Sequence, residues 1–456
     1  MSVLPGGLRV CVESVPQYGR GLAAVALTVA AGGDDDPAGR HGTAHLVEHL
    51  MFPRSGREGS ADPAGEGYAA LVAGAGGVCN AETHRDHTVF HTTVPAELLP
   101  DALAWEAGRL LGFAPTEDVI RTETDVIGEE IRGAGDAGRY WESALGALYP
   151  GSRDSFGTAA ELAGITAGEV EAFFRAHYTA PRMVLSVVGD VDPARVMAVV
   201  REVFGGVGVI GVAGVARAAV VARVAGEVRT AEEPRAAEQT RAARDIRTAE
   251  QTHTARAPRA ATEIRTAPLP AARPGVAVGH PLPDPVADRP AYLAQAVLAQ
   301  VLGRSRLPAL ARSARDGHRL TSATVTCGYH GQWLASAAPD LTLAVLGRAP
   351  GTEVGAAVDI WRSVLRAVAD GPLPEAEHRR AVNSLLVAWH RQADSLPTRA
   401  VALGRDALLL PGSAGPDALP AELRRTTPAE VSAAARALLE GPVTVTELAP
   451  QKGTVG

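Results

Sequence analysis

The spacing of apolar residues changes repeatedly along the first half of the chain. Short β-branched runs bounded by Gly and Pro alternate with stretches whose apolar residues recur at helical spacing. The spacing predicts strands at 8–13, 23–30, 78–94 and 183–188, and helices at 41–51, 96–111, 116–132 and 193–204. Pro95 and Pro115 mark the starts of two of these helices. Such alternation is typical of layered folds that contain both helices and sheets.

The second half repeats this order of elements from residue 276 onward. The pattern predicts strands at 322–329, 341–346 and 443–448, and helices at 291–302, 354–369 and 375–392. The two halves are similar in length and in the order of their elements. We therefore predict an α+β protein built from two related αβ domains, at 1–208 and 275–456.

A tract of different character separates the halves, from 209 to 274. RTAEEPRAAEQTRAARDI at 229–246 is followed by RTAEQTHTARAPRAATEI at 247–264, which is a repeat of 18 residues. Bulky apolar residues are nearly absent. The repeat therefore buries too little apolar surface to offset the conformational entropy that it would lose on folding. We predict a low-complexity interdomain linker, with a solvated helix as the alternative.

Composition narrows the chemistry. Only one of the 44 basic residues is a lysine, Lys452, which argues against a Walker-A lysine and a Schiff-base lysine. The formal charge of -7 gives no basic excess for nucleic acid. Three scattered cysteines, no signal-peptide pattern and no apolar run long enough to span a bilayer predict a cytoplasmic protein without a membrane partner.

The segment HGTAHLVEHLMF at 41–52 carries the main candidate chemistry. His45 and His49 are four residues apart, so on a helix both imidazoles lie on one face and can ligate one zinc ion. Glu48 is three residues after His45, where it can reach a water at the metal without being a ligand. This is the inverse of the His-Glu-x-x-His order. The alternative is a surface helix with polar residues.

Catalytic zinc sites usually have three protein ligands, so a third should be present. Glu123 and Glu130 are seven residues apart on a predicted helix and therefore point the same way. One can be the ligand and the other a second carboxylate near the site, while Glu129 faces away. The alternative is a solvated acidic face, which is the commoner position of Glu on helices.

Several phrases together resemble the pitrilysin/insulinase family of zinc peptidases, and more closely its short two-domain branch, which includes mitochondrial processing peptidase. In chain order they are GLRVCVE, HGTAHLVEHLMF, GGVCNAETHRDHTVF, ETDVIGEEIR, FGTAAELAGITAGEVEAFFRAHYTAPRMVLSVVGDVD and GRSRLPALAR. The resemblance is strong over about 4–204 and weaker over about 276–450. It implies two αβ domains, each an antiparallel-rich mixed sheet with helices packed on one face, that form half of a clam-shell chamber.

The resemblance also implies roles for individual residues. The zinc ligands would be His45, His49 and Glu130, with Glu48 as general base and Glu123 as supporting carboxylate. Asn80 and Ala81 would lie in the edge strand that binds substrate. The implied activity is zinc-dependent hydrolysis within extended peptides.

One departure from the family bears on partners. Single-chain members carry an Arg and a Tyr in the second domain that hold the substrate backbone. Here Arg312 is available, but Thr321 stands where the tyrosine is expected. In two-chain members the zinc motif and the Arg/Tyr pair lie on different subunits. We therefore expect this chain to be the catalytic subunit of a heterodimer whose homologous partner lacks the zinc motif, with a homodimer as the weaker possibility.

Other readings of the sequence stay open. A noncatalytic structural or peptide-binding subunit is the alternative function, although such members usually lose parts of the zinc motif. The GVGVIG match at 206–211 lacks the strand and helix that a dinucleotide site requires. His84, His87 and His91 cluster in the sequence but would not share one face of a strand, which favours ordinary polar placement over a second metal site.

Overall fold

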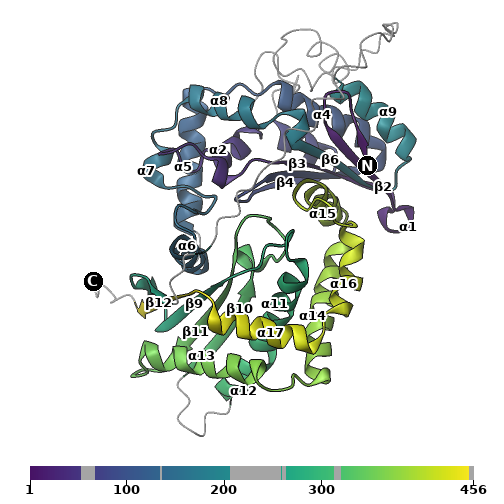
Figure 1. The fold of residues 1–456 in the computed structure, drawn as a ribbon. Coiled ribbons are helices and arrows are strands. Elements are labelled where there is room, and N and C mark those ends of the chain that lie inside the picture. The colour runs from purple at the N-terminus through teal and green to yellow at the C-terminus, as the bar shows by residue number, and fades with distance from the viewer. Residues whose placement is uncertain (53–66, 134–135, 206–257, 259–262, 313–319, 451–456) are drawn as a thin grey trace, which may run out of the picture. The chain divides into compact units, whose positions relative to one another are not determined.

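The computed structural model describes all residues except 53–66, 134–135, 206–257, 259–262, 313–319 and 451–456. The described chain packs into two compact units (Figure 1). The first contains Met1–Ile131, Ser155–Thr254 and Ala393–Leu409, and the second contains Arg132–Asp154, Ala255–Gln392 and Leu410–Gly456. Each unit therefore takes one segment from the other's half of the sequence.

Unit 1 is built on a six-stranded mixed sheet with the order β1-β2-β6-β3-β5-β4. β2 and β6 are parallel, and the other neighbours are antiparallel. The strands are β1 (Ser2–Val3), β2 (Arg9–Ser14), β3 (Leu22–Val29), β4 (Val78–Thr83), β5 (Thr88–Pro95) and β6 (Met183–Gly189). The predicted strand at 78–94 is thus wrong as one element, because the chain reverses where the backbone N–H of His84 donates to the carbonyl of His87.

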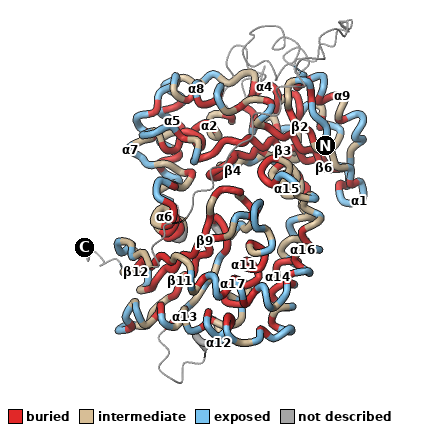
Figure 2. Tube along the Cα trace, in the orientation of Figure 1, coloured by how far each residue is buried: buried red, intermediate tan, exposed pale blue. Residues whose placement is uncertain are grey.

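Helices cover both faces of this sheet. On one face of β3, Ala23, Val25 and Leu27 share a core with residues of α2, α4, α5, α8 and α9. On the other face, Ala24 and Ala26 pack against Leu396 and Ala400 of α15. Two-sided coverage explains why β3 and β6 are buried along nearly their whole length (Figure 2). The helices are α1 (Pro16–Gly19), α2 (Thr43–Leu50), α3 (Tyr68–Gly74), α4 (Leu99–Leu111), α5 (Glu117–Gly133), α7 (Ala159–Leu162), α8 (Ala167–His177), α9 (Pro193–Phe204) and α15 (Leu396–Leu409).

Unit 2 has a second mixed sheet with the order β10-β11-β9-β12-β7, and β8 also pairs with β12. β12 is parallel to β7 and β8, and the remaining pairs are antiparallel. The strands are β7 (Glu263–Arg265), β8 (Leu269–Ala271), β9 (Gly275–Pro281), β10 (Leu320–Cys327), β11 (Leu341–Arg348) and β12 (Val443–Pro450). β7 and β8 fall in the last part of the predicted linker range, where Ile264 and Leu269 pack on the sheet. The 18-residue repeat lies almost entirely outside the described residues.

The helices of unit 2 also lie on both sheet faces. Val276 and Val278 of β9 share a core with α11, α13 and α17, while Ala277 packs against α6 (Figure 1). The helices are α6 (Asp136–Leu148), α11 (Arg289–Val301), α12 (Leu307–Arg312), α13 (Val354–Ala369), α14 (Glu375–Ala393), α16 (Leu419–Arg425) and α17 (Pro428–Glu440), with a π-helical turn at Leu302–Arg306.

The two mixed sheets with their helix layers confirm the predicted α+β class. The strand directions in β2-β6-β3-β5-β4 are repeated in β7-β12-β9-β11-β10. The prediction placed helices on one face of each sheet. The structure has an additional helix on the other face, α15 in unit 1 and α6 in unit 2. Within the described part of the chain, no helix is both long enough and apolar enough to cross a membrane.

Candidate metal centre

Helix α2 starts at a fixed point next to the sheet. Both carboxylate oxygens of Asp36 accept hydrogen bonds at the helix start, from the backbone N–H of Gly42 at 2.7 Å and of Ala44 at 2.8 Å. Gly42 has a φ of 99°, and a Cβ there would lie 3.0 Å from the carbonyl of Phe156. The close approach of these two backbones sets the position of the α2 side chains.

His45, His49 and Glu130 converge at one point. The Nε2 atoms of His45 and His49 lie 3.5 and 3.6 Å from the same oxygen of Glu130 on α5. Their potential ligand atoms are all within 4.8 Å of one another. The three residues that the sequence nominated as ligands are therefore brought together, from two helices far apart along the chain.

The two histidines have different protein neighbours on the side away from Glu130. Nδ1 of His49 lies 3.1 Å from Oε2 of Glu123, which is buried. The backbone carbonyl of Phe156 faces His45, and the Phe156 ring meets the His45 ring edge to face. For His49, an acceptor at Nδ1 favours the tautomer whose Nε2 lone pair is free to bind a metal. Glu123 thus contacts the candidate ligand His49 but is not itself one of the three clustered ligands.

The electrostatics of the two imidazoles differ. Burial lowers the pKa of His45 to about 4, aided by the charge of His49 and opposed by the carbonyl of Phe156. Burial also acts to lower the pKa of His49, but the hydrogen bond to Glu123 and the nearby carboxylates outweigh it and raise that pKa. His45 is therefore neutral near pH 7, which is the form that a metal requires.

Glu48 points from α2 toward the end of β4. Its Oε2 accepts a hydrogen bond of 2.5 Å from the hydroxyl of Thr83. Burial raises the pKa of Glu48, and the hydrogen bond from Thr83 opposes this effect. A carboxylate in such a place accepts a proton more readily than one in water.

The cluster fits a zinc ion by its own dimensions. Ligands about 2.1 Å from a tetrahedral zinc are about 3.4 Å apart, close to the 3.5 and 3.6 Å separations between imidazole and carboxylate. Two imidazole nitrogens and one carboxylate oxygen are a donor set that zinc prefers in catalytic sites. The residues present therefore suit the predicted cofactor.

Asn80 and Ala81 lie on β4, which is the edge strand of the unit 1 sheet. Asn80 is exposed, and Ala81 packs toward the core that contains α2. Among the described residues, no strand pairs with the outer side of β4. The position agrees with the expected substrate edge, and the assignment of these two residues remains a prediction.

Arg312 and Thr321 belong to unit 2. Arg312 is the last residue of α12, with a side chain outside the described set, and Thr321 lies on β10. The expected tyrosine is therefore absent from β10, while Tyr329 follows that strand and is buried against Trp141. The role of Arg312 in binding substrate remains a prediction.

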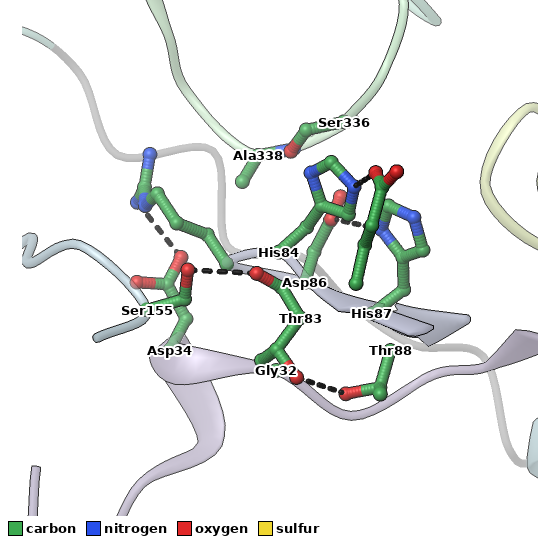
Figure 3. A network of polar contacts seen from close by, with 12 residues as sticks. Gly32, Asp34, Thr83, His84, Asp86, His87, Thr88, Ser155, Ser336 and Ala338 are labelled. Atoms are coloured by element: carbon green, nitrogen blue, oxygen red, sulfur yellow. Dashed lines mark hydrogen bonds and ion pairs between the residues drawn. The ribbon is translucent and has the colours of Figure 1, made fainter. Parts of the chain in front are cut away.

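The histidines after Asn80 form a separate arrangement (Figure 3). His84 and His87 stack with ring centroids 4.4 Å apart, and His84 pairs with Glu82 at 3.3 Å. His91 lies on β5, opposite Asn80. Within the described ranges, the His45–His49–Glu130 group is the one cluster of three metal-binding side chains.

Sequence reasoning did not single out Thr83 and Phe156. Thr83 lies in the same CNAET stretch as Asn80, two residues after Ala81, and its hydroxyl contacts the predicted base. A period-2 pattern places it on the same face as Ala81, which is a signal the sequence contains. Phe156 contributes through its backbone carbonyl, for which a sequence gives no sign.

Family models match both halves of the chain. The model described as insulinase (peptidase family M16) matches residues 12–134, and the model described as peptidase M16 inactive domain matches 164–385. Together they cover more than half of the chain. The candidate ligands and Glu48 all lie in the first match.

Curated relatives carry peptidase names. An uncharacterised zinc protease of Mycobacterium tuberculosis is 33% identical over 209 residues, which are 45% of this chain and 46% of the relative. The mitochondrial-processing peptidase subunit beta of Saccharomyces cerevisiae is 28% identical over 212 residues, which are 45% of this chain and 44% of that protein. The match thus spans about half the length of these relatives.

Solved structures show the same fold. A protease from Helicobacter pylori superposes with a TM-score of 0.75 at 18% identity, over 98% of each chain. A chain of complex III from Candida albicans gives a TM-score of 0.67 at 12% identity, over 98% of this chain and 95% of that one. With two family models along its length and this fold, the chain belongs to the insulinase (M16) family of peptidases.

Proposed function

We propose that this chain is a zinc-dependent endopeptidase that cleaves extended peptides. One observation carries the proposal: two imidazole nitrogens converge on one carboxylate oxygen at zinc-ligand spacing, with Glu48 one residue before a candidate ligand. Relatives named zinc proteases support the same reaction. His45, His49 and Glu130 would hold the ion, with Glu123 orienting His49.

A bound zinc ion would supply a Lewis acid that polarises the scissile carbonyl and makes a nearby water more acidic. Glu48 would take a proton from the water that attacks the carbonyl carbon, and later pass it to the leaving nitrogen. The raised pKa of the buried Glu48 suits a group that must hold this proton between the two steps. The peptide would bind as an added strand on the open edge of β4, beside Asn80 and Ala81.

We further propose that the chain acts as the catalytic subunit of a heterodimeric processing peptidase. Two features support this: the zinc motif is complete, and Thr321 occupies the place of an expected substrate-binding tyrosine. Relatives include mitochondrial-processing peptidase beta subunits. Arg312 would bind substrate backbone in this account. Domain limits of 1–208 and 275–456 and a cytoplasmic location remain predictions from the sequence.

A noncatalytic structural or peptide-binding subunit is the second candidate. The model described as an inactive domain and the likeness to a chain of complex III favour it. The inactive-domain match begins at residue 164, after every candidate ligand. The complete ligand set therefore favours catalysis.

Zinc dependence tests the proposal directly. The purified full-length chain should contain zinc and, together with a copurifying homologue, should cleave an internally quenched, unfolded peptide. Treatment with 1,10-phenanthroline should abolish cleavage, and added zinc should restore it. A zinc-loaded chain that cleaves no peptide, alone or with a copurifying homologue, would contradict the catalytic proposal. Full activity as a monomer would contradict the heterodimer.

A further inference from the structure

Thr83 is the last residue of β4 and faces helix α2. Along β4 the burial alternates, with Val78, Asn80 and Glu82 exposed and the residues between them half-buried. Ala81, on the same face as Thr83, packs with the core that contains α2. The Thr83 side chain is therefore directed to the side of the sheet from which Glu48 projects.

The bond between Thr83 and Glu48 is short and has a clear direction. An ionised carboxylate can only accept, so the hydroxyl of Thr83 donates its proton to Oε2 of Glu48 at 2.5 Å. Hydrogen bonds to a charged acceptor are shorter and stronger than neutral ones. Within the described chain this is the hydrogen bond that holds the Glu48 carboxylate.

The neighbouring hydroxyl of Thr88 does not compete for the proton that Thr83 donates to Glu48. Thr88 faces Thr83 across the strand pair, with the two hydroxyl oxygens 3.4 Å apart (Figure 3). Thr88 donates its own proton to the carbonyl of Ala31 at 2.8 Å. Each hydroxyl has one proton, so Thr88 does not bind Glu48 and Thr83 is not needed to satisfy Thr88.

The backbone of Thr83 is fixed from the other side. The hydroxyl of Ser155, a buried residue, donates to the carbonyl of Thr83 at 2.8 Å (Figure 3). The next residue, Phe156, faces His45 with its carbonyl. A Cβ on Gly157 would lie 2.6 Å from the carbonyl of His41, so this segment packs tightly before α2. One short segment thus supports both the strand end that reaches Glu48 and the first candidate ligand.

We propose that Thr83 is a positioning residue for Glu48: its hydroxyl holds the carboxylate in the orientation from which it takes a proton, and Ser155 holds Thr83. The inference rests on the proposed peptidase function. Thr83 would act on the rate of the chemical step and not on zinc binding or peptide docking.

Matched variants of the zinc-loaded full chain test this role. Thr83→Val keeps the shape and removes the hydroxyl, so kcat should fall about 10- to 100-fold, as expected for loss of a hydrogen bond to a charged group, with KM and zinc content unchanged. Thr83→Ser should restore most of kcat. Thr88→Val, which removes a buried hydroxyl next to the same site, should leave kcat close to wild type. Wild-type kcat in Thr83→Val, or an equal loss in Thr88→Val, would overturn the proposal.

A second measurement does not depend on activity. Urea unfolding of the zinc-free wild type, Thr83→Val, Glu48→Ala and the double variant should reveal coupling, with Thr83→Val destabilising only when Glu48 is present. Additive effects would overturn the contact. If the wild-type chain hydrolyses no peptide, either alone or with a copurifying homologue, the proposed function fails, and this cycle still decides whether Thr83 holds Glu48.

Discussion

Helices α2 and α11 occupy the same place in two sheets of the same topology, yet they differ in what they carry. Each follows the strand at the centre of its sheet, β3 or β9, and precedes the strands at the sheet edge. α2 presents His45, Glu48 and His49 next to that edge. α11 is buried along nearly its whole length and is mostly apolar.

The buried Gln295 of α11 shows the contrast most clearly. The buried amide of Gln295 donates to the carbonyl of Pro281 and to Thr342, each at 2.9 Å, so it ties the helix to its sheet. The imidazoles of α2 instead direct Nε2 toward Glu130. One fold thus supports a helix used for packing and a helix that carries the candidate metal ligands, and the difference lies in a few side chains.

Buried carboxylates repeat this contrast. In unit 2, Asp340 accepts hydrogen bonds from the indole of Trp141 and from the backbone N–H of Tyr329 and Leu341. Among the described residues, Glu48 in unit 1 receives one hydrogen bond, from Thr83. Asp340 is thus held by several donors within the packed unit, whereas Glu48 is held by the hydroxyl of Thr83.

The largest expected effect comes from removing a ligand on α2. His49→Ala should lower zinc affinity by more than about 100-fold. This exceeds the decrease in affinity expected when a residue that only hydrogen-bonds to a ligand is removed. Gln295→Leu, the matched change on α11, should leave zinc content unchanged. Metal analysis after dialysis against a zinc buffer measures both. Retained zinc in His49→Ala would break the comparison.

Loss of the carboxylate that contacts His49 should have a smaller effect. Glu123→Gln keeps the shape but weakens the acceptor for Nδ1 of His49, so zinc affinity should fall about 10- to 100-fold. Glu129→Gln on the same helix is the control, because Glu129 is exposed. Equal zinc affinities for the two variants would show that Glu123 does not support the metal centre.

In unit 2 the corresponding test affects stability. Asp340→Asn leaves one oxygen and introduces an amide beside three donors, so the free energy of unfolding should fall by about 1–3 kcal/mol. Urea unfolding followed by Trp fluorescence measures the loss. Asp118→Asn, at an exposed carboxylate, should have no measurable effect. Zinc content should be unchanged in both variants, and zinc loss in Asp340→Asn would contradict the division of roles.

The last expected effect concerns acid and appears only below about pH 6.5. Burial, aided by the charge of Arg362, lowers the pKa of His280 from 6.5 to about 3. The indole of Trp361 donates to Nε2 of His280, which must therefore be unprotonated. The unfolded chain binds this proton below pH 6.5 and the folded chain does not, so stability falls as the pH decreases from about 6.5 toward 3. His280→Gln should show a shallower decrease in urea midpoint over this range, and an unchanged slope would refute the assignment.

Much of the fold follows from local sequence. Helix α13 has its predicted bounds, and α2, α5 and β6 differ by a few residues, because apolar spacing and Pro or Gly mark their limits. The partners of α6 and α15 could not be predicted, since an amphipathic helix shows which face it buries but not against which sheet. Helix α6 lies in the first half of the chain but packs on the sheet of unit 2. Helix α15 lies in the second half but packs on the sheet of unit 1.

The candidate site divides in the same way. Spacing on single helices grouped His45 with His49 and Glu123 with Glu130, and the structure brings the two pairs together. The separate tasks of Glu123 and Glu130 depend on side-chain directions that spacing leaves open. The contacts of Thr83 and of the Phe156 carbonyl depend on tertiary packing, which local pattern does not encode.

The central claim is that Glu48 performs chemistry at a zinc centre that it does not build. Glu48→Gln should be measured beside the wild type for zinc content, peptide affinity and single-turnover cleavage of one quenched peptide. We predict unchanged zinc, unchanged peptide affinity and a cleavage rate lower by about 10²- to 10⁴-fold, the usual contribution of a general base. A Glu48→Gln chain that retains zinc and cleaves at the wild-type rate would contradict the account.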